Sequence, residues 1–255
     1  MQLTIKHPFL CLPVVSHPKD TRVLKLFDGE KLLLCVYFPF GEAAADNGTY
    51  SYEYLSPLPV SEWMGRTLTL SAEFPAGFED AVTQTDELPV SGEVHPAVHF
   101  TANAGWINDP NGLVYDNGTY HLYYQHNPFG VNWNNMSWGH ATSTDLLHWT
   151  RLPVAMLPDE EGTIFSGCGL TNEHRDEIQA AADSNLYRSL PKDALLFFYT
   201  AAGGSHDSAC SEGKDYTQHT AYSTDHGLTL QKLPGAVVPF LKTDNRDPKV
   251  YWHEK

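Results

Sequence analysis

The stretch that decides the fold lies near the middle of the chain and reads Trp106-Ile107-Asn108-Asp109-Pro110-Asn111-Gly112, followed at once by Leu113-Val114-Tyr115-Asp116-Asn117-Gly118-Thr119-Tyr120-His121-Leu122-Tyr123-Tyr124. In its second part, two strand-like runs flank Asn117-Gly118, a pair that supplies the two positive φ angles of a type I′ turn. The sequence therefore predicts a β-hairpin here. Asp109 would lie at the start of the first strand, between two amides and close to aromatic residues.

Strand signals dominate the rest of the chain as well. From residue 1 to about 90, short alternating runs are separated by turn residues, a spacing typical of a small β-sandwich; the clearest runs are Val23–Phe27, Leu32–Phe38, Tyr50–Leu55 and Thr67–Phe74. The polar segment Thr83–His95 is interpreted as a linker, and helical periodicity is confined to about Glu173–Leu190. We predict an all-β protein with a sandwich-like region at 1–90 and a second region at 95–255.

An internal repeat indicates the architecture of the second region. Ser143–Pro153 begins Ser-Thr-Asp and ends Leu-Pro, as does Ser223–Pro234, and the two serines lie 223 − 143 = 80 residues apart. This interval exceeds a bare four-stranded propeller blade of roughly 40 to 50 residues. We assign the excess to the helical segment near Glu173 and to the Gly-rich loop Gly203–Gly213. A β-propeller fits this pattern.

Composition excludes several classes of partner. The 255 residues include 16 basic and 31 acidic ones, for a net charge of −15. Affinity for phosphates comes from Lys and Arg, so neither nucleic acid nor an anionic membrane surface is expected as a partner. No run approaches the roughly 18 apolar residues of a membrane span. A neutral polyol remains compatible with such an acidic surface.

The cysteines and histidines give no sign of a metal or a cofactor. Cys11, Cys35, Cys168 and Cys210 are too scattered for a disulfide framework and lack C-x-x-C spacing, so we expect buried thiols. The thirteen histidines contain no H-E-x-x-H or similarly compact set. The N-terminal stretch Met1–Val15 lacks a basic n-region and a cleavage site, which leaves a cytoplasmic location as the default expectation.

A second Asp-Pro segment strengthens the signal of Asp109. Arg246-Asp247-Pro248 lies 247 − 109 = 138 residues after it and continues into Lys249-Val250-Tyr251-Trp252. Between the two segments come the blocks Tyr123–Pro128, Trp133–His140 and Phe165–Cys168. In kind and order these blocks resemble glycoside hydrolase family 32, which comprises invertases, inulinases and levanases. The resemblance covers roughly residues 95 to 255.

The resemblance implies a fold, a reaction and a set of site residues. The family has a five-bladed β-propeller whose inner strands carry the catalytic carboxylates, so this chain would contain its first blades. It acts on β-fructofuranosidic bonds of sucrose, levan or inulin with retention. Asp109 would be the nucleophile and Asp247 would stabilise the transition state; Asn108, Gln125, Trp133, Ser166 and Arg246 would bind the fructosyl unit. Amides and hydroxyls suit sugar hydroxyls, and an indole suits the apolar ring face. For Trp138 and Trp149, a site role and core packing stay equally open.

One functional group of the family has no counterpart in the sequence. The general acid/base lies in a Glu-Cys segment well beyond Arg-Asp-Pro, and we interpret Glu254 as a structural residue. The chain is therefore expected to be a fragment that is inactive by itself, since a natural half-propeller would leave open strand edges. The alternatives are a fructosyltransferase, which shares the covalent intermediate, and a catalytically silent fructan-binding protein. Oligomeric state is not predicted.

Overall fold

The computed structural model describes residues 1–255 apart from 43–48, 90–95, 175, 177–183, 243 and 254–255. Antiparallel β-sheets make up nearly all of it, so the all-β prediction is confirmed. Helical structure in the described residues is limited to η1 (Ser61–Trp63), α1 (Phe78–Ala81) and α2 (Ser184–Ser189). None of these helices is long or apolar enough to cross a bilayer.

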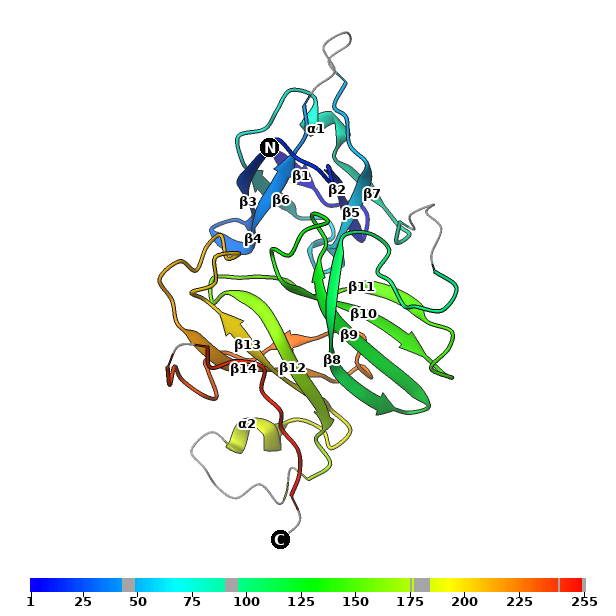
Figure 1. The fold of residues 1–255 in the computed structure, drawn as a ribbon, viewed down its shortest axis with the longest axis vertical. Helices are drawn as coiled ribbons and strands as arrows, with labels where there is room; N and C mark the ends of the chain where they lie inside the picture. Colours follow the sequence, from blue (N-terminus) through cyan, green and yellow to red (C-terminus); the bar gives the residue numbers. More distant parts are fainter. Residues whose placement is uncertain (43–48, 90–95, 175, 177–183, 243, 254–255) are drawn as a thin grey trace.

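Two sheets form a sandwich at the N-terminal end of the molecule (Figure 1). One has the strand order β1-β6-β3-β4 and the other β5-β2-β7. Their bounds are β1 Gln2–Thr4, β2 Phe9–Val14, β3 Asp20–Asp28, β4 Lys31–Phe40, β5 Tyr54–Pro59, β6 Thr67–Ser71 and β7 Thr83–Thr85. Strand β7 pairs with β2, so the segment interpreted as a linker begins with a strand.

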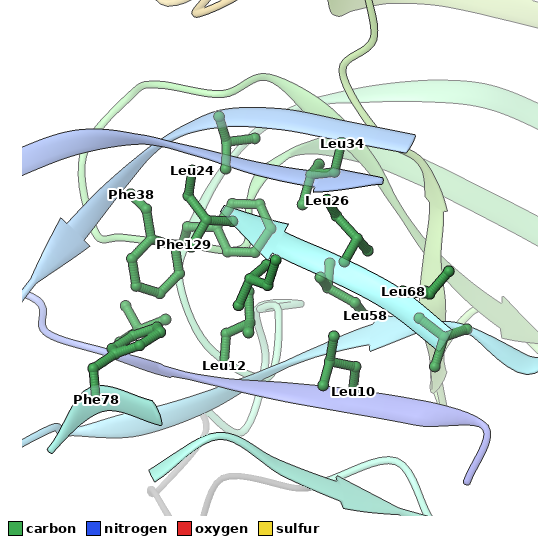
Figure 2. Close-up of a cluster of buried hydrophobic side chains, with 14 of the residues drawn as sticks. Leu10, Leu12, Leu24, Leu26, Leu34, Phe38, Leu58, Leu68, Phe78 and Phe129 are labelled. Atoms are coloured by element: carbon green, nitrogen blue, oxygen red, sulfur yellow. The ribbon is translucent and has the colours of Figure 1, made fainter. Parts of the chain in front are cut away.

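The sandwich core is closed by a residue from the other half of the chain. Leucines from both sheets, among them Leu12 of β2 and Leu24 of β3, interdigitate with Phe38 and Phe78 (Figure 2). Phe129, which follows the propeller strand β9, lies in the same cluster with its ring centroid 5.8 Å from that of Phe38. The N-terminal sandwich and the propeller therefore share buried apolar surface, which favours one fixed arrangement.

The remaining strands form two four-stranded blades, and the prediction of the first blades of a propeller is confirmed. Blade one is β8 (Trp106–Asp116), β9 (Thr119–Asn127), β10 (Ser137–Ser143) and β11 (Thr150–Met156). Blade two is β12 (Thr163–Thr171), β13 (Leu195–Ala202), β14 (Tyr216–Ser223) and β15 (Gln231–Lys232). The first strands, β8 and β12, lie side by side (Figure 1). The predicted hairpin joins β8 to β9, with φ of 46° at Asn117 and 86° at Gly118.

The sequence repeat corresponds to one turn at the same place in each blade. Ser143 is the last residue of β10, and its hydroxyl accepts hydrogen bonds from the backbone N–H groups of Asp145 and Leu146. Ser223, the last residue of β14, does the same for Asp225 and Gly227. The extra length of the repeat contains α2 and the β13–β14 loop, as predicted. Of the expected helix 173–190, only Ser184–Ser189 is helical in the described residues, and 175 and 177–183 lie outside them.

The prediction of four buried thiols is wrong for one pair. Cys35 of β4 and Cys210 of the β13–β14 loop form a disulfide across 175 residues of sequence, with their Cα atoms 6.0 Å apart. Cys11 and Cys168 are buried and unbridged, as expected. The bridge forms because the sandwich docks against the end of blade two, and no spacing in the sequence reveals that docking.

Candidate active site

A β-bulge in β8 presents Asp109. Ile107 pairs with His126 and Pro110 with Tyr124, so Asn108 and Asp109 together face the single residue Gln125. A bulge bends its strand and re-aims the side chains of its extra residue. Both Asn108 and Asp109 are solvent-exposed at this point, although the strand continues into buried residues. The Trp106 indole N–H donates to Asn108 Oδ1 at 2.7 Å, which holds the amide beside the carboxylate.

The same bulge occurs in β12, and it brings a hydroxyl to Asp109. Ile164 pairs with Ala201 and Gly167 with Tyr199, so Phe165 and Ser166 face Thr200 alone. Ser166 Oγ donates to Asp109 Oδ2 at 2.8 Å. A hydrogen bond to an ionised carboxylate is stronger than one between neutral groups. Two neighbouring blades therefore fix the orientation of one exposed carboxylate.

The two residues that face the bulges each bind the backbone of the next segment. Gln125 is only 2% exposed, and its Nε2 donates to the Ile164 carbonyl of β12 at 2.8 Å. Thr200 is fully buried, and its Oγ1 accepts the backbone N–H of Asp247 at 3.0 Å. Gln125 thus lies behind Asp109 and joins the blades. Its predicted contact with the fructosyl unit stays a prediction.

The carboxyl group of Asp247 interacts electrostatically with that of Asp109. Burial is the main cause that raises the pKa of the Asp247 carboxyl, and the negative charges of Asp109 and Asp244 raise it further. Arg246, whose Nε is 3.7 Å from Asp247 Oδ2, opposes the rise. Asp247 also has a positive φ of 61°, a conformation that costs free energy unless surrounding contacts hold it. The hydrogen bond to Thr200 is one such contact.

Aromatic side chains form a wall beside these carboxylates. The Phe165 ring is central: Trp133 packs edge-on against it with centroids 5.9 Å apart, and the Arg246 guanidinium carbon is 5.9 Å from its centroid. Trp106 and Tyr216 belong to the same cluster. The wall therefore joins residues from β8, β12, the β9–β10 loop and the C-terminal segment in one place.

Most of the predicted site residues meet here. Asn108 and Asp109 share one bulge, and Ser166 bonds Asp109 directly. Trp133 and Arg246 reach the same place through contacts with Phe165. Asp247 is held there by Thr200. No local motif marks Thr200, and the Phe165–Cys168 block predicts a role for Ser166 but none for Phe165. Trp138 is fully buried against Phe197 and Tyr199 between the blades, so core packing explains it. Glu254 lies outside the described residues.

The chemistry of this arrangement follows from its parts. An exposed carboxylate held by a hydroxyl can attack an electrophilic carbon, and a second carboxylate beside it can stabilise a positively charged transition state. Amide and indole groups line the same place and suit a neutral, hydroxyl-rich ligand. In the part of the chain that the structure describes, no group of three His, Cys, Asp or Glu side chains could hold a metal ion.

A propeller with an exposed carboxylate on its first strand and a second carboxylate that interacts with it is the architecture of a class of glycosidases, and comparison with known proteins specifies which one. Residues 99–255 match the glycosyl hydrolases family 32 N-terminal domain, so the chain belongs to glycosyl hydrolase family 32. It is 40% identical over 191 residues to a levanase of Bacillus subtilis (strain 168), covering 74% of this chain and 25% of the levanase. It is 36% identical over 202 residues to a fructan beta-fructosidase of Streptococcus mutans, covering 77% of this chain and 13% of that protein.

A solved structure supports the same assignment. The fructofuranosidase from Schwanniomyces occidentalis, complexed with fructose, superposes with a TM-score of 0.51 at 34% identity. The match covers 62% of this chain and 30% of that one. The chain thus spans about a quarter or less of the length of the two curated relatives named above.

Proposed function

We propose that the protein containing this chain cleaves β-fructofuranosidic bonds in sucrose or in a fructan such as levan or inulin, with retention of configuration. The observation that carries the proposal is the exposed Asp109 carboxylate, held by Ser166 from the adjacent blade and coupled to Asp247. Relatives named levanase, fructan beta-fructosidase and fructofuranosidase support the substrate class.

The reaction would proceed in two displacements at one carbon. An oxygen of Asp109 attacks the anomeric carbon of the fructosyl unit, while the bond to the leaving oxygen breaks and a carboxylic acid protonates that oxygen. In the family, that acid lies in a Glu-Cys segment that follows the Arg-Asp-Pro block. Asp247 would bind sugar hydroxyls more tightly as positive charge develops, and interactions that strengthen in the transition state are those that accelerate the reaction. Water then releases fructose from Asp109.

Replacement of the nucleophile tests the proposal most directly. In the full-length protein, Asp109→Asn keeps the shape of the side chain and removes the attacking charge. Release of fructose from sucrose, inulin and levan should fall by roughly 10³- to 10⁵-fold, as expected when a covalent catalyst is lost. Asp116→Asn, the same change at the other end of β8, is the matched control: the Asp116 side chain is 15% exposed and bonds His226 at 2.8 Å rather than any residue of the site. Its activity should stay within about threefold of wild type, because the change lies away from the site and keeps an oxygen that can accept from His226.

Two results would contradict the assignment. Turnover by Asp109→Asn similar to that of the control would exclude Asp109 as nucleophile. An inverted first-formed anomer, seen by NMR in early hydrolysis, would exclude the retaining mechanism. Binding of fructan by wild-type protein without any hydrolysis or transfer would favour the silent binding protein instead, and products longer than the substrate would favour a fructosyltransferase.

The cytoplasmic location expected from the sequence stays a prediction, and the disulfide bears on it. The Cys35–Cys210 bridge is of a kind that persists in oxidising compartments. Fractionation of the source cells, combined with non-reducing electrophoresis, distinguishes these locations.

A further inference from the structure

We propose that His206 is a specificity residue that binds the sugar on the leaving side of the scissile bond, together with the indole of Trp133, which would then contact both the fructosyl unit and the sugar next to it. This inference rests on the proposed function and adds a second sugar position to it. His206 lies in the β13–β14 loop, is exposed to solvent, and places its ring centroid 5.1 Å from that of Trp133 with an interplanar angle of 34°.

A continuous series of contacts runs outward from Asp109 to His206. Asp109 accepts a hydrogen bond from Ser166, and the preceding Phe165 packs against Trp133. Trp133 in turn packs against His206. From Phe165 onward the exposure of the side chains rises: Phe165 is 5% exposed, Trp133 is half-buried and His206 is exposed. A saccharide whose fructosyl unit reaches Asp109 would therefore extend its next sugar along Trp133 toward His206.

The loop that carries His206 is held from three sides. The neighbouring Asp207 is 2% exposed; its Oδ2 accepts the Met136 backbone N–H at 3.1 Å and its Oδ1 accepts the Thr163 hydroxyl at 3.2 Å. Cys210 ties the loop to β4 of the sandwich. Within the loop, Ser211 Oγ donates to the Gly203 carbonyl at 2.9 Å. Because the backbone is already held, binding of a ligand to His206 does not also have to order the loop.

The chemistry of the two rings suits a neutral sugar. An indole and an imidazole at this angle offer ring surface to the apolar C–H face of a pyranose or furanose. The imidazole nitrogens can donate to or accept from hydroxyl groups, whichever the ligand presents. Both contacts are available to glucose, the leaving sugar of sucrose, and to fructose, the leaving sugar of a fructan.

The test compares substrates that do and do not have a leaving sugar. In the full-length protein, kcat/KM is measured for sucrose, inulin, levan and methyl β-fructofuranoside, whose leaving group is methanol. His206→Ala should lower kcat/KM about tenfold for at least one of the three saccharides, the loss expected for one ring contact or hydrogen bond. The value for methyl β-fructofuranoside should stay within about twofold. His206→Gln, which keeps a hydrogen-bonding group, should recover part of the loss.

The controls separate this inference from the proposed function. Glu212→Ala, at an exposed position of the same loop, should leave all four values unchanged. Equal losses on methyl β-fructofuranoside and the saccharides, or no loss on any of them in either His206 variant, would overturn the role of His206 while the proposed function stands. If wild type released no fructose from any of the four substrates, the proposed function would fail and this inference with it.

Discussion

The two blades share a backbone device and differ in the side chains that it presents. In blade one the bulge exposes Asn108 and Asp109, whereas in blade two the equivalent bulge carries the buried Phe165 and the hydroxyl of Ser166. The bulge in blade one therefore supplies the carboxylate of Asp109, and the bulge in blade two supplies its hydrogen-bond donor, Ser166. The repeated backbone thus sets the position of the site, while the residue at each bulge sets its chemistry.

The blades also differ in how they are attached to the N-terminal sandwich. Asn135, in the β9–β10 loop of blade one, exchanges two hydrogen bonds with the backbone of Tyr37, at 2.8 and 2.9 Å. Phe129 from the same loop fills the sandwich core. Blade two is attached covalently through Cys35 and Cys210. Because β4 provides both Tyr37 and Cys35, one strand supports the loops on which Trp133 and His206 lie.

Removal of the covalent attachment should have the largest effect on stability. The double variant Cys35→Ser with Cys210→Ser should lower the free energy of unfolding by about 2–4 kcal/mol, because the bridge restricts the unfolded chain. Urea unfolding of the oxidised protein and of the variant measures the difference. Dithiothreitol should destabilise wild type to a similar degree and leave the variant unchanged. Four titratable thiols in the denatured, unreduced wild type would show that the bridge is absent.

Removal of the Ser166 hydroxyl, which joins the two bulges, should have the next largest effect; here the property that changes is activity. Ser166→Ala leaves Asp109 without its donor from blade two. Since a hydrogen bond to a charged group contributes about 1.5–3 kcal/mol, kcat/KM for sucrose should fall by roughly 10- to 100-fold. Ser166→Thr keeps a hydroxyl and should retain more activity than Ser166→Ala. Full activity of the alanine variant would mean that the hydrogen bond from Ser166 to Asp109 is not needed for the reaction.

The repeated turns should give the smallest effect, and the same effect in both blades. Ser143→Ala and Ser223→Ala each remove a hydroxyl that accepts two backbone N–H groups, so each should cost about 1 kcal/mol of unfolding free energy. Activity should be unchanged, because each turn lies at the other end of its blade from the bulge. Thermal or urea unfolding of the two variants tests this. If one substitution lowered the free energy of unfolding by 2 kcal/mol or more beyond the other, the two turns would not contribute equally to stability.

The site was predictable only in part. The sequence indicated Asp109, Ser166, Trp133 and Asp247 through blocks that resemble a known family, and the structure brings these residues together. It did not indicate that Gln125 would be buried with its amide nitrogen bound to Ile164, nor that Thr200 would hold Asp247. These roles depend on which residue of a partner strand faces a bulge. Register between strands is set by the whole sheet, so no single segment contains it.

What the sequence by itself determined is local. Asn117 and Gly118 both adopt positive φ angles, and this conformation makes the tight turn between β8 and β9. Ser143 and Ser223 form their turns through hydrogen bonds to residues at most four positions away. Tertiary structure alone decided the bridge between Cys35 and Cys210, the place of Phe129 in the sandwich core, and the strand at Thr83–Thr85. Each of these contacts joins segments more than 70 residues apart in the chain. Their partners are chosen by the packing of whole sheets, because burial of apolar surface is non-directional and specifies no particular pair in advance.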